Sequence, residues 1–248
     1  MPWGDMPAHW YEAYDRGRPG YPPAVVDVAA LSPYATVLEL AAGTGQLTRV
    51  LRSRCAHVIA TEPDPGMRRF LVEHVPDARV VSASADDIPL TTASVDAVFA
   101  AQAFHQFDAP RAVAEIARVL RPGGVLVLLW NVQAGAAEPS LASVEELLVP
   151  DWPTGWDPLD LGVGYGRSAW KARITSSPFG ELREERLANP QTVDRDALVA
   201  FFGSMGWIAL KADDERVRLL DDVRALLTSE HYALPWETRL HWARLPTS

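Results

Sequence analysis

Residues 36–51 read TVLELAAGTGQLTRVL. The segment has a short apolar run that ends at Leu40, a loop of small residues, and then apolar residues at helical spacing. A continuous apolar run bounded by glycine is typical of a buried parallel strand, and an i, i+3, i+4 pattern indicates an amphipathic helix. A strand, a glycine turn and a helix in this order predict the nucleotide-binding corner of a doubly wound α/β fold.

The glycine loop also indicates which class of nucleotide it would hold. A dinucleotide site requires G-x-G-x-x-G, but Thr48 stands where the third glycine would follow Gly43 and Gly45. Glu39 stands at the entrance of the loop, where its carboxylate would repel a pyrophosphate. A ligand with an ammonium group and a sulfonium would instead be attracted, and S-adenosylmethionine (SAM) carries both. The loop therefore favours SAM over a dinucleotide.

Composition limits the class of protein. The 248 residues are 48% hydrophobic, enough for one α/β domain with an insertion. The formal net charge of -9 argues against a protein that mainly grips nucleic-acid phosphates. Cys55 is the single cysteine, which excludes an intrachain disulfide, and we interpret it as packing at a helix end. We expect a soluble cytoplasmic protein, because the first residues lack the form of a signal peptide and no apolar run approaches the ~20 residues of a membrane helix.

The rest of the chain alternates between predicted strands and helices, which favours a parallel sheet. The predicted strands after the first are 57–61, 79–82, 94–101, 125–129 and 234–245, and the predicted helices are 25–31, one starting near Pro65, 110–120, 194–205 and 213–227. Residues 131–178 show little periodicity, and we expect them to form an insertion over the carboxyl edge of the sheet.

The insertion contains candidate substrate contacts. Its tryptophans would line an apolar or aromatic acceptor pocket, or else form a small core of the insertion itself. Its basic residues would orient an anionic substrate, or else be solvated surface charge. These residues are Trp152, Trp156, Trp170, Arg167, Lys171 and Arg173.

Polar residues follow three of the predicted strands. Glu62 lies about twenty residues beyond the loop, where a doubly wound fold places a carboxylate on ribose hydroxyls, although it could instead cap the next helix. Ser84 and Asp86 lie beside the expected adenine position, or simply form a turn. His105 follows the fourth strand. It could act as a base, or pack between its neighbouring phenylalanines.

The first 23 residues have an unusual composition, with HWYEAYDRGRPGYPP at residues 9–23. Trp10, Tyr11 and Tyr14 would share one face of a short helix, and the prolines and glycines that follow impose an irregular, extended segment. We expect an N-terminal arm that either packs on the core or forms a lid over a ligand.

Six segments, taken in order, resemble the class I SAM-dependent methyltransferases. In particular they are similar to the small-molecule branch that includes trans-aconitate-type methyltransferases. The segments are YDRGRPGYP at 14–22, VLELAAGTG at 37–45, VIATEPDPGM at 58–67, SASADDIPL at 82–90, AQAFHQFD at 101–108 and RVLRPGGVLVLLW at 118–130. The resemblance implies a Rossmann-like, doubly wound α/β fold with a seven-stranded sheet whose last strand is antiparallel. The resemblance covers most of residues 10–130, and we expect a single domain, 1–248, with a lid arm at 1–23, a SAM-binding core at 24–130, a substrate cap at 131–190 and a C-terminal part at 191–248.

The resemblance also implies a set of site residues. Tyr14 and Arg18 would close over the methionine end of SAM, which Glu39, Ala41, Gly43 and Thr44 would surround. Glu62 would hold the ribose hydroxyls, Pro63 and Met67 would flank the adenosine, and Ser84, Ala85 and Asp86 would lie along the adenine. Gln102 and His105 would lie near the sulfonium and the acceptor. The chain departs from many relatives in having Ala41 instead of glycine and Ser84 instead of aspartate.

The implied reaction is in-line methyl transfer from SAM, with S-adenosylhomocysteine (SAH) as product, to a carboxylate or hydroxyl oxygen of a small apolar or aromatic metabolite. A carboxylate needs no base, whereas a hydroxyl would use His105. We expect no metal, no nucleic acid and no membrane as partner, and a monomer or homodimer. The alternatives are an enzyme of natural-product biosynthesis that uses this fold for rearrangement or cyclisation, a nicotinamide-dependent oxidoreductase, and a non-catalytic SAM-binding protein.

Overall fold

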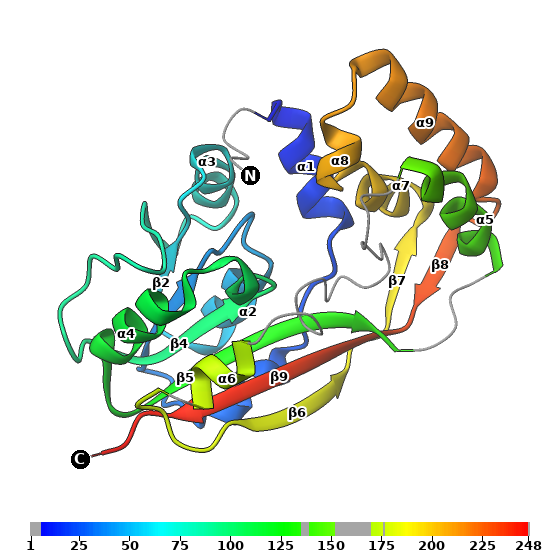
Figure 1. Cartoon of the computed structure of the whole chain (residues 1–248). Helices are drawn as coiled ribbons and strands as arrows, with labels where there is room; N and C mark the ends of the chain where they lie inside the picture. The colour runs from blue at the N-terminus through cyan, green and yellow to red at the C-terminus, as the bar shows by residue number, and fades with distance from the viewer. Residues whose placement is uncertain (1–5, 135–138, 152–169, 176, 248) are drawn as a thin grey trace.

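The computed structural model describes residues 6–134, 139–151, 170–175 and 177–247. Its centre is a seven-stranded sheet in the order β3-β2-β1-β4-β5-β9-β6 (Figure 1). The strands are β1 (Thr36–Leu40), β2 (His57–Thr61), β3 (Arg79–Val81), β4 (Val95–Ala101), β5 (Leu120–Gln133), β6 (Arg183–Ala188) and β9 (Trp236–Arg244). All pairs from β3 to β5 are parallel, and β9 is antiparallel to both β5 and β6. The predicted doubly wound sheet with an antiparallel last strand is confirmed.

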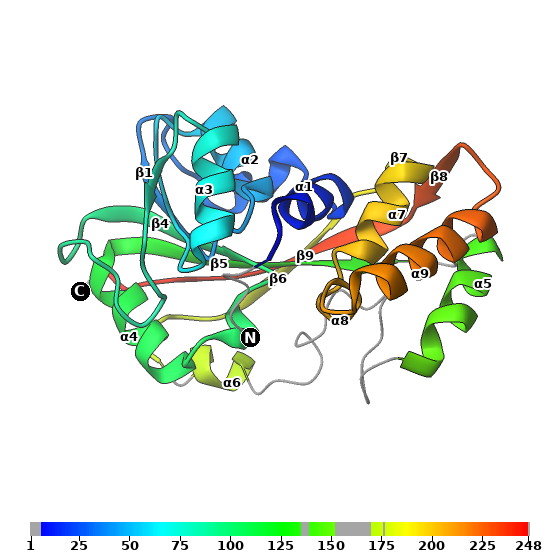
Figure 2. The ribbon, with the colours of Figure 1, turned by 90° about the horizontal axis from the view of Figure 1, so that it is seen from above.

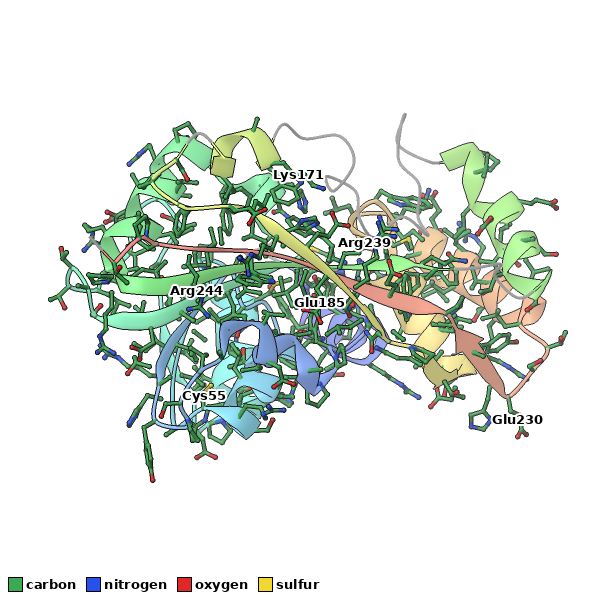
Figure 3. All side chains as sticks on the ribbon, turned by 90° about the horizontal axis from the view of Figure 1, so that it is seen from below. Cys55, Lys171, Glu185, Glu230, Arg239 and Arg244 are labelled. Atoms are coloured by element: carbon green, nitrogen blue, oxygen red, sulfur yellow. The ribbon has the colours of Figure 1, made fainter. Side chains whose placement is uncertain are left out.

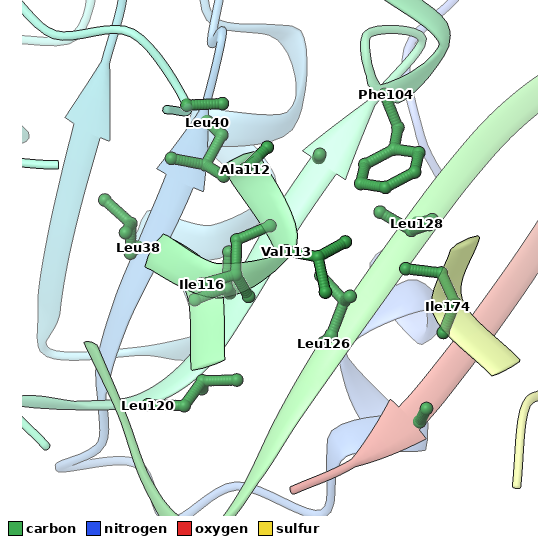
Figure 4. Close-up of a cluster of buried hydrophobic side chains, with 14 of the residues drawn as sticks. Leu38, Leu40, Phe104, Ala112, Val113, Ile116, Leu120, Leu126, Leu128 and Ile174 are labelled. Atoms are coloured by element: carbon green, nitrogen blue, oxygen red, sulfur yellow. The ribbon is translucent and has the colours of Figure 1, made fainter. Parts of the chain in front are cut away.

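The two faces of the sheet carry different helices (Figure 2). The 3-10 helix η1 (Pro23–Ala29) and α2 (Gln46–Arg54) cover one face, whereas α4 (Ala109–Val119) and α6 (Trp170–Thr175) cover the other. Each face of the sheet has its own hydrophobic core, and the side chains of β4 alternate between them. Ala97 and Phe99 face the core on the α2 side, and Val98 and Ala100 face the core on the α4 side. Figure 4 shows the second core, where Ile116 of α4 packs over the sheet. Because β1 lies between β2 and β4, the chain reverses its direction of winding there, and such sheets bind ligands at the carboxyl ends of the strands at this point.

A second group of elements lies beyond the far ends of β5 and β9 (Figure 1). It contains α5 (Pro139–Leu148), η3 (Val149–Asp151), β7 (Gln191–Asp194), α7 (Arg195–Gly203), α8 (Gly206–Ala209), α9 (Asp213–Leu226) and β8 (His231–Leu234). Phe202, Met205 and Tyr232 are at its buried centre. The arm helix α1 (Ala8–Gly17) lies between α3 (Pro65–His74) and α7, and therefore joins this group to the sheet.

Several predicted boundaries were wrong. Residues 25–31 were expected as a helix, and the structure has a 3-10 helix that ends at Ala29. The expected strand 234–245 is divided at Pro235, since proline has no N–H for a sheet ladder, and β8 pairs with β7 in a separate two-stranded sheet. β6 was not predicted, and it falls within the range expected to be a cap, as does the end of β5. The β6 sequence, REERLA, is charged because β6 is a mostly exposed edge strand.

Cys55 packs at the end of α2, as predicted, and burial raises the pKa of its thiol. Figure 3 shows it on the α2 side of the sheet, opposite Lys171 on α6. Among the helices that the structure describes, none is both long and apolar enough to cross a membrane.

Candidate active site

The glycine loop turns sharply at the carboxyl end of β1. Ala41, Gly43 and Gly45 all have positive φ, at 53°, 60° and 100°. Alanine is strained in this conformation by about 1–2 kcal/mol, a cost that typically persists at functional sites. Gly45 disfavours a side chain, because its φ of 100° strains other residues and an added Cβ would lie 2.6 Å from Leu71 Cδ1. The loop is therefore a tight left-handed turn whose backbone is open to a ligand at Gly43, where an added Cβ would meet only Met67 Sδ, at 3.8 Å.

Glu62 binds the loop rather than the following helix. Its Oε2 accepts from the Gly43 N–H and its Oε1 from the Asp64 N–H, both at 2.8 Å. Asp64 caps α3 by accepting from the Met67 N–H at 2.8 Å, so the alternative that Glu62 caps this helix is wrong. Burial raises the pKa of Glu62, although the two N–H donors oppose this shift. The carboxylate is thus held at the end of β2, facing the glycine loop.

Glu39 is buried near the end of β1, beside Glu62. Its Oε2 accepts a hydrogen bond from Thr48 Oγ1 at 2.6 Å. Burial raises the pKa of Glu39 to about 8, and the charge of Glu62 adds to this shift. Thr44 is also buried, and its hydroxyl donates to Gln46 Oε1 at 2.8 Å.

The arm brings a guanidinium to the same region. Arg18 Nε donates to Ser204 Oγ at 2.9 Å, and the group lies over the rings of Tyr14 and Phe201, 4.9 and 5.5 Å from their centroids. Desolvation lowers its pKa. Burial raises the pKa of the Tyr21 phenol. The charge of Glu39 raises this pKa further, whereas the charge of Arg18 lowers it, so both charges act on the Tyr21 side chain.

The charges of Arg49 and Arg68 act on Glu39 and Glu62 respectively, but neither arginine forms an ion pair with these carboxyl groups. Among the described residues, no ion pair joins Arg18, Glu39 or Glu62 to an oppositely charged side chain. Desolvated charges normally occur paired, because water no longer stabilises them. Arg18 and Glu39 therefore both act on Tyr21, Glu62 acts on Glu39, and none of the three forms an ion pair among the described residues.

The loop after β3 has the structure of a polar turn. Ser84 hydrogen-bonds to Asp86, which lowers the pKa of that carboxyl, and Asp86 also pairs with Arg111 at 3.2 Å. Ala85 is buried in the core cluster. Near the loop after β2, Pro63 is exposed and Met67 is buried. The structure thus accounts for Ser84 and Asp86 as turn residues, while their proximity to adenine stays a prediction.

Gln102 and His105 follow β4. Gln102 has φ 55° and donates from Nε2 to the Asn131 carbonyl oxygen at 3.1 Å, while its Oε1 is buried without a partner in the described chain. His105 lies in the 3-10 helix η2 (Phe104–Gln106). Its Nδ1 is likewise buried and without a described partner, and burial lowers its pKa. Phe104 and Phe107 contact each other, and no ring contact joins either to His105 within the resolved segments, which disfavours the packing alternative.

The expected acceptor-pocket tryptophans divide into two groups. Trp170 stacks on Trp130 at 4.8 Å and meets His241 edge-on at 4.8 Å, so it belongs to the core of the sheet rather than to a separate pocket wall. Lys171 pairs with Glu184 at 3.3 Å on the surface. Trp152, Trp156, Arg167 and the side chain of Arg173 lie outside the described residues.

Two polar residues of this region were not predicted. Asn131 is fully buried at the end of β5 and binds the arm, and Ser204 after α7 binds Arg18. Asn131 directly follows the apolar run VLVLLW, so a polar residue at the carboxyl end of a strand was the available signal. Ser204 has no comparable sequence signal, because only the packing of α1 on α7 brings it near Arg18.

Comparisons with known proteins agree with this geometry. The family described as "Methyltransferase domain" matches residues 38–128. An uncharacterised methyltransferase of Mycobacterium tuberculosis is 35% identical over 236 residues, which are 91% of this chain and 90% of that protein. A malonyl-[acyl-carrier protein] O-methyltransferase of Methylococcus capsulatus is 38% identical over 116 residues, 44% of this chain and 42% of that protein.

A solved structure from Anaeromyxobacter dehalogenans, assigned as a type II methyltransferase, superposes with a TM-score of 0.68 at 25% identity, covering 93% of this chain and 99% of that one. The likeness to the mycobacterial protein spans nearly the whole chain, and the family match spans the strand, loop and helix corner together with β2 to β5. The chain therefore belongs to the class I SAM-dependent methyltransferases.

Proposed function

We propose that this protein transfers a methyl group from SAM to an oxygen atom of a small apolar or aromatic metabolite. One observation carries the proposal, namely that the desolvated Arg18 and Glu39 both act on Tyr21, that Glu62 acts on Glu39, and that none of the three forms an ion pair among the described residues. The amino-acid end of SAM is a zwitterion with a carboxylate and an ammonium, and its ribose has two hydroxyls. A ligand with this combination would complement all three side chains.

Each group has a place in this assignment. Arg18 and Tyr14 would hold the carboxylate of SAM, Glu39 its ammonium, and Glu62 the ribose hydroxyls. Glu62 already accepts two N–H bonds, but a carboxylate has about four acceptor sites, so two stay available. Ala41, Gly43 and Thr44 would surround the methionine portion, Pro63 and Met67 would flank the adenosine, and Ser84, Ala85 and Asp86 would lie along the adenine. When bound, SAM supplies a methyl carbon activated by its sulfonium.

The malonyl-[acyl-carrier protein] O-methyltransferase among the relatives supports oxygen as the acceptor atom. A carboxylate acceptor is already anionic, and a dry pocket assists a reaction in which charges neutralise. A hydroxyl acceptor must lose a proton. His105 suits that role because burial disfavours its protonated form, and its buried Nδ1 has no partner among the described residues.

Calorimetric titration tests the cofactor assignment. We expect SAM and SAH to bind the wild type, and NAD not to bind. In Glu62→Ala, loss of hydrogen bonds to a charged group should weaken SAH binding about 10- to 100-fold. Glu185→Ala, at an exposed position of β6, is the control and should bind SAH like the wild type. Binding of NAD, or no binding of SAM, would refute the proposal.

A methyl-transfer screen with labelled SAM tests the acceptor. Small carboxylic acids and phenols are the first candidates. In His105→Ala, turnover of a carboxylic acid should persist, whereas turnover of a phenol should fall by about 100- to 10,000-fold because the base is lost. Phenol turnover at the wild-type rate would eliminate the base role of His105. Conversion of a substrate without label transfer would favour rearrangement or cyclisation.

A further inference from the structure

Three side-chain amides converge on one backbone oxygen in the arm. The carbonyl of Gly20 accepts from Asn189 Nδ2 at 2.9 Å, Asn131 Nδ2 at 3.0 Å and Gln191 Nε2 at 3.2 Å. We call Asn131, Asn189 and Gln191 the Gly20 clamp. A carbonyl oxygen has two lone pairs, so three donors saturate it. This concentration of donors on a single loop carbonyl holds that segment in one place.

The clamp is itself anchored in the sheet. Asn131 lies in β5, fully buried, and its Oδ1 accepts from Thr238 Oγ1 of β9 at 2.6 Å and from Asn189 Nδ2 at 3.2 Å. Its Nδ2 faces the carbonyls of Pro19 and Gly20, which fixes the orientation of the amide. Every polar atom of this side chain is used. A shift of the arm would leave buried polar groups unsatisfied, at about 1–3 kcal/mol each.

Apart from the clamp, side chains hold this segment near its two ends, because Arg18 donates to Ser204 and Tyr21 packs against the hydrophobic core on the α2 side of the sheet. Residues 18–22 lie between α1 and η1 and belong to neither, Arg18 is extended, and Pro19 has no N–H to donate. Arg18 is the residue directly before the clamped peptides. The backbone carbonyl of Asn131 also accepts from Gln102 Nε2, so one residue connects the arm with the loop after β4.

We propose that the Gly20 clamp positions Arg18 over the anionic end of the ligand, so that Asn131 and Asn189 act on binding through the arm without touching the ligand. This inference rests on the proposed function, which assigns Arg18 to the carboxylate of SAM. A purely structural clamp would instead stabilise the fold and leave ligand selectivity unchanged. The positioning role and the structural role therefore predict different affinities of a clamp variant for ligands with and without the anionic end.

The test compares two ligands by calorimetry. SAH carries the amino-acid end, whereas 5′-methylthioadenosine has the adenosine and sulfur without it. Asn189→Ala is the main variant, because Asn189 lies outside the strands and its loss is less disruptive than that of Asn131. It should bind SAH about 5- to 10-fold more weakly, the effect of one lost hydrogen bond, and methylthioadenosine within about twofold of the wild type.

A double-mutant cycle shows whether the effect passes through Arg18. Arg18→Ala should weaken SAH binding more than Asn189→Ala does, and the double variant should bind no more weakly than Arg18→Ala alone. Val223→Ala, a core truncation in α9, controls for lost stability and should change neither affinity. Asn131→Ala should match Asn189→Ala where it folds.

The outcomes separate the clamp from the proposed function. Equal weakening of both ligands by Asn189→Ala, or a further loss in the Arg18→Ala background, overturns the positioning role. Unchanged SAH affinity in Asn189→Ala also overturns it, while the wild-type binding of SAH leaves the proposed function standing. A wild type that binds neither ligand overturns both.

Discussion

At the scale of single residues, the candidate site contains two carboxyl groups whose pKa burial raises. Glu39 is the clearest case, with a pKa of about 8 and a neutral hydrogen-bond partner, Thr48. A ligand ammonium would favour its ionised form. The same residue should therefore tie both stability and ligand affinity to pH.

Glu39→Gln should change how stability depends on pH. Between pH 4.5 and about 8 the folded wild type holds a proton that the unfolded chain has released, so its free energy of unfolding should fall as pH rises. The variant should lack this contribution, which is on the order of 2–4 kcal/mol across the window. Urea unfolding at pH 5 and 8.5 measures it, with exposed Glu185→Gln as control. Parallel pH profiles for wild type and Glu39→Gln would show that Glu39 ionises normally.

At the scale of elements, α1 is both a packed arm and a source of site residues. Arg49 of α2 pairs with Asp15 at 2.9 Å, and Arg16 pairs with Asp194, the N-cap residue of α7, at 3.1 Å. Neighbouring residues thus fasten α1 in two directions, although partly exposed ion pairs contribute little each. Close packing on α7 through Gly17 provides a firmer constraint.

Gly17→Ala should separate α1 from α7. An added Cβ would lie 2.3 Å from the Phe201 backbone nitrogen and 2.5 Å from its Cα, and helix backbone cannot move aside locally. We expect a loss of about 1–3 kcal/mol in the free energy of unfolding, together with weaker SAH binding, because Tyr14 and Arg18 move with the arm. Gly20→Ala is the matched control for stability, since nothing lies within 4 Å of its added Cβ. Equal stability of the two variants would mean that α1 and α7 can move apart to accommodate the added methyl group without loss of stability.

At the scale of the whole molecule, β5 and β9 run from the sheet to the second group of elements and carry a shared aromatic core. Trp130 of β5, Trp170 of α6 and His241 of β9 pack together there. Burial lowers the pKa of His241 to about 4, so the imidazole is neutral in the folded state. The core of the sheet is therefore sensitive to acid.

His241→Asn should flatten the acid side of the stability profile. Between pH 6.5 and about 4 the unfolded chain binds a proton at His241 that the folded chain does not, so wild-type stability should fall as pH falls through this window. The contribution is about 1–3 kcal/mol and should be absent in the variant. Thermal unfolding at pH 4.5 and 7 measures it, with exposed His57→Asn as the comparison. An equal loss on acidification in His241→Asn would assign the effect to other groups.

The sequence by itself determined the features that depend on local order. β1, β2, β4, the glycine loop and the position of Glu62 follow from apolar runs, helical periodicity and glycines within some thirty residues, because such signals need only neighbours along the chain. The family resemblance extended this to the antiparallel last strand.

Other features were decided only by the tertiary structure. β6 resembles a charged loop in sequence and becomes a strand because β9 offers it an edge. Asp64 rather than Glu62 caps α3, since the glycine loop competes for Glu62. Gly20 meets Asn131 and Asn189 across 111 and 169 residues, and Arg18 meets Ser204 across 186 residues. No local pattern records these contacts, because they depend on the register of β5 with β9 and on the docking of α1 against α7.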